Sequence, residues 1–266
     1  MSDAENQLRQ LLRAALQTGD SSALESYLEA HSGLPGPRGN LELMHRFADE
    51  AAAQGDSVLP LLERWSALTI DEAPVNSARE ILVAAAAEAY APIAIAQPDR
   101  RDGMQAHLRR AASDPRWRTR ELVAMAMQRL LSHDWAATLA VLRAWAVDSD
   151  PLLVRAAAAS IAEPPVLTDE ARGREAVAIQ ALAVERFRSF EFSKAESVRT
   201  LRQALGFTIS VATVPAPEAG FALLGQMAAS GDPDLRWIVR ENLKKNRLNK
   251  WPDRVASVAA SLDASR

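Results

Sequence analysis

Asp114-Pro115-Arg116-Trp117-Arg118 is the stretch that decides the fold, because its opening recurs twice along the chain. Asp150-Pro151-Leu152-Leu153-Val154-Arg155 starts 36 residues later, and Asp232-Pro233-Asp234-Leu235-Arg236 starts 82 residues after that. An interval of 82 is about two units of 41, and a helical unit repeating at roughly 40 residues is typical of HEAT or armadillo helix pairs. In each copy an aspartate precedes a proline, which places an N-cap acid before the first helical position.

Helical spacing of apolar residues continues outward from these phrases in both directions. Two helices are expected within residues 1–31, and the others at about 41–54, 58–68, 77–97, 102–113, 116–132, 134–147, 151–162, 168–190, 193–212, 216–230, 233–248 and 251–262. Short turns between them force neighbouring helices to pack antiparallel. The expected fold class is therefore all-α, an α-α superhelix in the form of a HEAT/armadillo-like solenoid of antiparallel helix pairs.

Breaks in the helical pattern give few domain boundaries. The Gly- and Pro-rich loop at 32–40 and the breaker at 71–76 are the candidates. We expect residues 1–266 to form a single solenoid, with 1–75 as an N-terminal helical part and 76–266 as the main repeat region. The alternative is that 1–75 forms a separable N-terminal bundle.

Composition limits the function classes. The chain has 266 residues, of which 48% are hydrophobic and 5% aromatic, so the expected core is mostly Ala and Leu. Cysteine is absent, which excludes disulfides, thiolate zinc sites and cysteine nucleophiles and fits a reducing cytoplasm. The first residues do not resemble a signal peptide, and no run of about 18 apolar residues predicts a membrane span. We therefore expect a cytoplasmic protein that contacts no membrane.

Charge is distributed unevenly along the chain, although the net charge is only −3. Residues 1–100 contain 7 Lys or Arg against 15 Asp or Glu, whereas residues 101–266 contain 24 against 19. Such asymmetry can mark a polyanion-binding surface. The alternative is that these charges only solvate the helix faces of a repeat protein.

A row of cations marks the segment from 235 to 250. Arg236, Arg240, Lys244 and Arg247 step by four, four and three residues, and Trp237 lies beside them. Cations with a flanking indole are what phosphate-backbone binding requires. The alternative is that Trp237 fills a gap between repeats and that the cations favour the helix dipole.

Two further segments hold candidate binding residues. Arg118 shares a helix face with Glu121, Met125 and Arg129, and it is either a partner contact or one half of an ion pair that orders the stack. Trp145 falls ten residues after Trp135, so the two rings share a helix face, with Arg155 following in the next helix. The alternative for these tryptophans is ordinary core packing.

Patterns of conventional catalysis are missing from the sequence. The four histidines lack the spacing of a metal site, so no metal is expected. Gly-rich phosphate loops and the Gly-x-Ser-x-Gly elbow are absent as well. We therefore expect no cofactor, and no catalytic residue is assigned.

Two stretches resemble the HEAT-like alkylpurine DNA glycosylases of the AlkD-like family. Trp145-Ala146-Val147-Asp148 followed by Val154-Arg155-Ala156-Ala157 is similar to that family's tryptophan, turn and Arg-Arg-Ala helix start. Trp237-Ile238-Val239-Arg240-Glu241 is similar to its late Trp-x-x-Arg-Glu helix. The resemblance implies an all-helical solenoid with a DNA groove lined by Trp237, Arg240 and Arg155. Asp148 is the acid nearest to the position of the family's catalytic acid.

Three functions follow from these patterns. The first is a non-enzymatic HEAT-like binding or scaffold protein that engages a partner along its concave face, the partner being a protein or a polyanion. The second is a DNA-binding protein of the AlkD-like DNA repair type, which includes a DNA glycosylase as one form, with DNA bound along a basic C-terminal groove. The third is an enzyme of another class.

Overall fold

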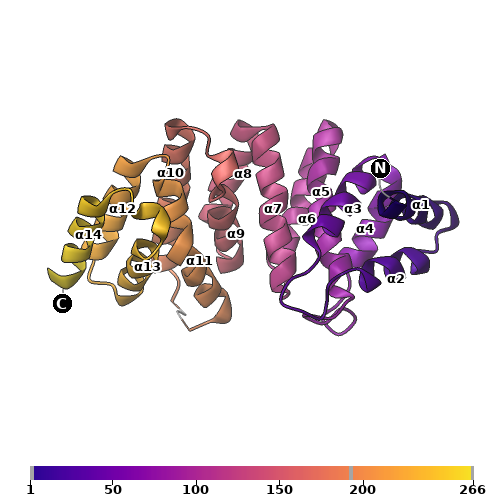
Figure 1. The fold of residues 1–266 in the computed structure, drawn as a ribbon, viewed down its shortest axis with the longest axis horizontal. Helices are drawn as coiled ribbons and strands as arrows, with labels where there is room; N and C mark the ends of the chain where they lie inside the picture. The colour runs from indigo at the N-terminus through magenta and orange to yellow at the C-terminus, as the bar shows by residue number, and fades with distance from the viewer. Residues whose placement is uncertain (1–2, 192–193, 265–266) are drawn as a thin grey trace. The chain divides into compact units, whose positions relative to one another are not determined.

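A computed structural model of the protein describes residues 3–191 and 194–264. Within these ranges the chain forms fourteen α-helices and four 3₁₀ turns, and it contains no β-strand (Figure 1). The prediction of an all-α protein is therefore confirmed. The helices fall into two compact units, Met1–His133 and Asp134–Arg266, so the predicted division at residue 75 lies inside the first unit. That the whole chain forms one continuous solenoid stays a prediction.

The first unit, unit 1, contains seven α-helices and is centred on α5. The helices are α1 (Asp3–Thr18), α2 (Ser22–Ala30), α3 (Leu41–Ala52), α4 (Leu59–Ser66), α5 (Glu80–Ala96), α6 (Arg101–Ala111) and α7 (Trp117–His133), with 3₁₀ turns at Gly55–Val58 and Pro98–Arg100. Every residue from Glu80 to Ala94 is buried, which is the property of a helix surrounded on all sides. Helices α3 and α7 both pack directly on α5, as do α2, α4 and α6.

The second unit, unit 2, contains the other seven α-helices in two rows. They are α8 (Trp135–Ala146), α9 (Pro151–Ile161), α10 (Glu170–Arg188), α11 (Glu196–Thr213), α12 (Pro217–Ala229), α13 (Pro233–Leu243) and α14 (Pro252–Ala264), with 3₁₀ turns at Pro164–Val166 and Asn246–Leu248. In one row α9 contacts α11 and α11 contacts α13, and in the other α8 contacts α10, α10 contacts α12 and α12 contacts α14.

Buried amides fix the register between neighbouring helices of unit 2. Gln180 donates to the Ala158 carbonyl at 2.9 Å and accepts from the Thr208 hydroxyl at 2.7 Å, which joins α10 to α9 and α11. Asn242 accepts from the Ser210 N–H and donates to the Leu205 carbonyl, each at 2.7 Å. Satisfied amides of this kind allow one packing arrangement where apolar contacts alone would allow several.

Helix positions agree with the sequence prediction to within a few residues, except at the end of α13. The predicted helix runs to residue 248, whereas α13 ends at Leu243 and the chain turns into a 3₁₀ segment that buries Leu248. Asn242, Asn246 and Asn249 surround this turn, and asparagine is a weak helix former because its side chain competes for backbone hydrogen bonds.

Two kinds of feature are absent from the described part of the chain. No helix in it combines the length and apolar character needed to cross a membrane. The same residues contain no group of three or more His, Asp or Glu side chains arranged to hold a metal ion.

Candidate partner-binding surfaces

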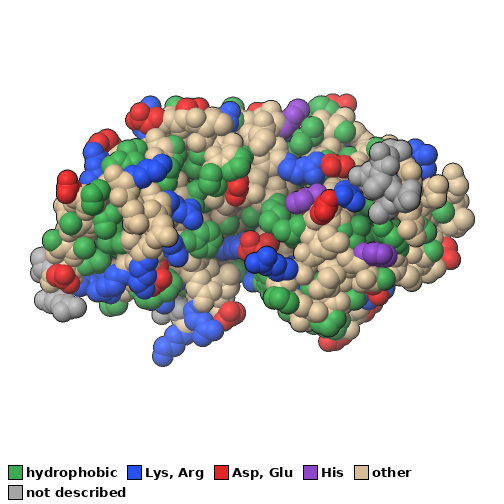
Figure 2. All heavy atoms as spheres, in the orientation of Figure 1, with side chains coloured by type: hydrophobic (Ala, Val, Ile, Leu, Met, Phe, Trp, Pro, Cys, Tyr) green, Lys and Arg blue, Asp and Glu red, His purple; other side chains and the backbone are tan. Residues whose placement is uncertain are grey.

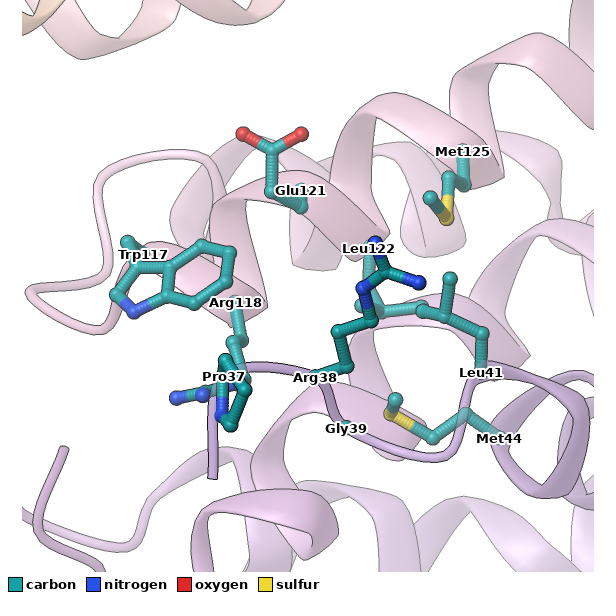
Figure 3. Close-up of a pocket in the computed structure, with 10 residues that line it drawn as sticks. All are labelled: Pro37, Arg38, Gly39, Leu41, Met44, Trp117, Arg118, Glu121, Leu122 and Met125. Carbon is teal, nitrogen blue, oxygen red and sulfur yellow. The ribbon is translucent and has the colours of Figure 1, made fainter. Parts of the chain in front are cut away.

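A pocket of about 350 Å³ opens in unit 1 between α3 and α7, the helices on either side of α5 (Figure 3). We call it the α3–α7 pocket. Its walls are mainly apolar, and its lining comprises Pro37, Arg38, Gly39, Leu41, Met44, Trp117, Arg118, Glu121, Leu122 and Met125. Trp117 is 44% exposed and Leu41 is 41% exposed, which is unusual for side chains of this size and hydrophobicity.

Helix spacing explains how α7 supplies one wall of this pocket. Trp117, Glu121 and Met125 are four residues apart and therefore lie on one side of the helix, as Figure 3 shows. Residues 37–39 and the first turn of α3 supply the opposite wall. There the Asn40 side chain accepts the Leu43 N–H at 3.1 Å, which caps α3 and fixes the direction in which the 37–39 loop leaves it.

Arg118 anchors the base of the pocket through a buried ion pair. Its Nη1 lies 2.9 Å from Glu80 Oε2, with the two side chains 6% and 0% exposed. Its Nη2 also donates to the Gly36 carbonyl at 2.6 Å and to Asn76 Oδ1 at 3.1 Å. The guanidinium carbon lies 4.4 Å from the Trp117 ring centroid. Arg118 thus joins α7 to α5 and to the loop that forms the pocket wall, and its partner is a glutamate of unit 1.

A second polar cluster joins α3, α5 and α7 around Glu88, which is fully buried on α5. His45 Nδ1 hydrogen-bonds Glu88 Oε1, and Arg129 pairs with Asp49 and lies 3.8 Å from Glu88. The hydrogen bond to Glu88 raises the pKa of His45, because it favours the protonated imidazole over the neutral one. This cluster ties the two walls together beyond the pocket.

Unit 2 contains the predicted C-terminal cations, and they do not form one exposed row. Arg236 is 7% exposed, and its guanidinium donates to the Leu262 carbonyl near the end of α14. Arg240 is exposed on α13, whereas Lys244 lies beyond the last helical residue and pairs with Glu241 at 2.5 Å. Arg247 is exposed in the following 3₁₀ turn. The burial of Arg236 and the end of α13 before Lys244 and Arg247 are what break the predicted row.

The other predicted site residues of unit 2 lie mostly in its interior. Trp145 is 3% exposed and Arg155 is 6% exposed, so neither presents a surface to a partner. Trp237 is half-buried, with Arg202 stacked 4.0 Å from its ring centroid and Gly206 of α11 beneath it. The interpretation that these aromatic side chains pack between helices is supported by their burial.

Other cations nevertheless remain around the end of α13, where Arg240, Arg247 and Lys250 are exposed and Lys245 is half-buried. Arg240, Lys245, Arg247 and Lys250 form no ion pair or hydrogen bond through their side chains within residues 3–191 and 194–264. Figure 2 shows Lys and Arg side chains gathered over this part of α13. We call these four residues the α13 cation cluster. Arg247 also borders an apolar pocket of about 340 Å³ lined by Leu167, Val211 and Val214 among others.

The α3–α7 pocket includes residues that the sequence did not single out. Arg118, Glu121 and Met125 were already expected on one helix face, but Leu41, Met44 and Arg38 were not considered. Their only sequence signal is the Gly- and Pro-rich loop at 32–40, which contains Arg38 and precedes Leu41 and Met44, and the sequence gives no indication of what that loop faces.

No protein-family model matches the chain, and no curated protein matches it either.

Proposed function

We propose that this protein is a non-enzymatic binding protein, and that a partner protein docks an apolar segment into the α3–α7 pocket. The observation that carries the proposal is the exposure of Trp117 and Leu41, at 44% and 41%, beside a pocket of about 350 Å³. Large aromatic anchors in such pockets account for much of the affinity at protein interfaces. Met44 and Met125 add flexible, polarisable walls that adapt to an incoming side chain.

Charge at the pocket rim indicates the chemistry of the partner segment. Arg38 is exposed, and nothing in the described parts of the chain pairs with its guanidinium. An acidic residue next to the apolar anchor of the partner would give this cation its counterion. Rim charges of this type set orientation and association rate more than affinity.

The packing pattern supports a HEAT-like arrangement as part of the same proposal. In unit 1, α3, α5 and α7 begin at residues 41, 80 and 117, which are intervals of 39 and 37 residues, and each packs on the next. In unit 2 alternate helices contact one another in two rows. Both features are expected of stacked helix pairs, which bind partners along a face. The lack of cysteine is consistent with a cytoplasmic setting for this function.

A peptide selection tests the docking proposal directly. Short random peptides displayed on phage are selected against the full chain, and the enriched peptide is synthesised with a fluorescent label. We expect peptides with an apolar anchor and an acidic neighbour. Fluorescence polarisation should show binding weakened about tenfold or more by Met125→Glu, because the carboxylate replaces an apolar wall and competes with the acidic residue of the peptide for Arg38. Arg38→Glu should weaken binding and favour peptides with a basic neighbour.

The matched control is Phe207→Glu, which changes a large apolar side chain of unit 2 that is 40% exposed. It should bind the selected peptide as the unchanged chain does. Equal binding by Met125→Glu and the unchanged chain would refute the docking proposal, and so would the absence of any enriched peptide.

A second candidate function is binding of DNA through the α13 cation cluster. The observation that favours it is that no acidic side chain in the described part of the chain pairs with Arg240, Lys245, Arg247 or Lys250. Cations without internal partners are free to neutralise phosphates. Because Trp145 and Arg155 are buried, the proposal is limited to contacts with the phosphate backbone and does not include base release.

Fluorescence anisotropy of labelled duplex DNA, plain and N-alkylated, tests this second candidate at two or more salt concentrations. Log affinity should fall with log salt by about 0.9 for each phosphate contact. Reversing the four cations to Glu should abolish binding, whereas Arg13→Glu, on α1, should leave it unchanged. Binding that ignores salt, or that survives the fourfold reversal, would exclude the cluster as the DNA site.

A further inference from the structure

A smaller cavity of unit 1 has a polar lining that combines opposite charges. Its volume is about 130 Å³, several times the roughly 30 Å³ that one water molecule occupies in the liquid. Its walls come from the end of α4, from α5, from α6, from the turn before α7 and from the first turn of α7. It shares no lining residue with the α3–α7 pocket.

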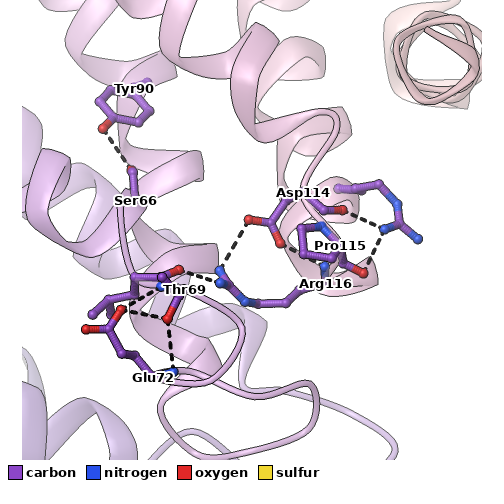
Figure 4. Close-up of polar contacts among 9 residues, drawn as sticks. Ser66, Thr69, Glu72, Tyr90, Asp114, Pro115 and Arg116 are labelled. Carbon is purple, nitrogen blue, oxygen red and sulfur yellow. Dashed lines mark hydrogen bonds and ion pairs between the residues drawn. The ribbon is translucent and has the colours of Figure 1, made fainter.

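Thr119 gives the first indication that this cavity holds a ligand. The residue is 0% exposed and lines the cavity, and its hydroxyl has no hydrogen-bond partner within the described residues. A buried hydroxyl without a partner is unfavourable, so such groups usually bond a ligand or an ordered water. The nearby Ser66 hydroxyl bonds the Tyr90 hydroxyl at 3.0 Å and keeps capacity for a second bond (Figure 4).

Arg110 supplies the positive side of the cavity. Its Nη2 donates to His107 Nδ1 at 2.7 Å, which requires that nitrogen to be unprotonated. Burial lowers the pKa of His107 and the charge of Arg110 lowers it further, against the opposing effect of Glu63 at 3.8 Å. Since His107 stacks on Tyr90 with ring centroids 4.3 Å apart, it holds the guanidinium at the edge of the cavity.

Asp114 supplies the negative side. Its carboxylate accepts the Arg116 N–H at 2.7 Å and lies 3.2 Å from Arg116 Nη1 (Figure 4). Burial nevertheless raises the pKa of Asp114 above its ordinary value, so these contacts do not fully compensate its lost hydration. A cationic group in the cavity would provide the missing compensation.

We propose that this cavity binds a small aliphatic α-amino acid. The carboxylate of the ligand pairs with Arg110, and its ammonium group pairs with Asp114. Thr119 and Ser66 complete the polar contacts. Val83 and Ala111, the apolar members of the lining, face the short side chain. Asp114 already pairs with Arg116 at 3.2 Å, so the ammonium group of the ligand supplements that ion pair, while the ligand carboxylate is the counterion of Arg110.

Ligands with one charge removed test the recognition of both ends. The full chain is titrated calorimetrically with L-alanine, N-acetyl-L-alanine, L-alaninamide and D-alanine, and its Tm is measured with each. L-Alanine alone should raise Tm, because a ligand that binds only the folded state stabilises it. The acetylated compound lacks the ammonium group, and the amide lacks the carboxylate. If none of the four compounds raises Tm, the cavity holds water only and the proposal is refuted.

Variants separate a ligand contact from a structural role. Thr119→Val preserves shape and removes the unpaired hydroxyl, so Tm without ligand should be unchanged or higher. Affinity for L-alanine should fall about tenfold in this variant and more in Arg110→Gln, where a charged donor is lost. Arg13→Gln, an exposed arginine on α1, serves as the control and should bind normally. Undiminished L-alanine affinity in Thr119→Val would overturn the assignment.

Discussion

Arg118 and Glu80 set the energetics of unit 1 at the scale of single residues. Both charges are removed from water, and their 2.9 Å contact is reinforced by bonds to Gly36 and Asn76. Removing one partner of such a pair leaves an uncompensated buried charge. We predict that Arg118→Met lowers the free energy of unfolding by about 3–5 kcal/mol, as measured by urea denaturation.

The same pair provides an internal control for that prediction. The Asn76 N–H donates to Glu80 Oε2 at 2.6 Å, and a glutamine at position 80 can still accept this bond. Glu80→Gln combined with Arg118→Met should therefore recover part of the loss. A double variant no more stable than Arg118→Met would show that the charge of Glu80 is not the source of the cost.

His45 makes stability depend on pH. Its pKa is raised above 6.5 chiefly by the hydrogen bond to Glu88, which is opposed by burial and by Arg129 and assisted by Asp49. A raised pKa in the folded state contributes stability that is fully present below the unfolded value and is lost as pH rises through the folded value. We predict that the unfolding free energy of the unchanged chain falls, relative to that of His45→Gln, as pH rises above 6.5.

Comparison with His45→Gln is needed because His107 titrates in the opposite sense. Its pKa is lowered from 6.5, so its contribution is present above that pH and is lost on acidification. Urea titrations of both chains, repeated from acid to mildly alkaline pH, isolate the contribution of His45 to the unfolding free energy. Parallel pH profiles for the two chains would contradict its assignment.

At the scale of helices, two glycines of α12 have opposite roles. A Cβ added at Gly220 would lie 2.3 Å from Thr213 Oγ1 and 2.6 Å from Thr213 Cβ, at the contact with α11. A Cβ added at Gly225 meets nothing within 4 Å. We predict that Gly225→Ala raises stability by about 0.5–1 kcal/mol through helix propensity. Gly220→Ala should lower it by about 1–3 kcal/mol through overpacking.

Thermal and urea unfolding of the two glycine variants check this prediction on one helix. Both substitutions lie in α12, so the difference between their unfolding free energies isolates the contact of position 220 with Thr213. Equal effects of the two substitutions would mean that α12 can shift away from α11 at no measurable cost.

Helix positions could be predicted from sequence because their signals are local. The Asp150 side chain accepts the Leu152 N–H, and Asp232 accepts the Asp234 and Leu235 N–H groups, so these two caps are confirmed. Asp114 differs, because it accepts the Arg116 N–H in a turn and α7 begins at Trp117. There the Arg116 guanidinium bonds Asp114 and the Leu68 carbonyl (Figure 4), a contact between distant segments that a local pattern does not contain.

Site residues were harder to predict, because exposure depends on which helix covers which face. The spacing of Arg236, Arg240 and Lys244 is helical, yet Arg236 lies inward to bond the end of α14. Arginine has a long apolar stem, so its charge does not guarantee exposure. Conversely, Trp117 has a large aromatic side chain of the kind usually found in a core. It is exposed because no described helix covers its side of α7.

At the scale of the whole molecule, the two compact units divide the candidate functions. The α3–α7 pocket, the buried Glu80 and Glu88, and their cationic partners all lie within Met1–His133. The α13 cation cluster and the amide bridges of Gln180 and Asn242 lie within Asp134–Arg266. Each unit has its own hydrophobic core, which is what independent folding requires.

We predict that residues 1–133 and residues 134–266, expressed separately, are each helical by circular dichroism and each unfold cooperatively. The first should bind the peptide selected on the full chain, because every residue that lines the pocket is present. The second should show the salt-dependent affinity for duplex DNA, if that candidate function holds. A fragment that lacks helix would show that its unit needs the other to fold. If both fragments fold but residues 134–266 bind the peptide and residues 1–133 bind the DNA, the sites inferred from Trp117 and from the α13 cation cluster are wrong.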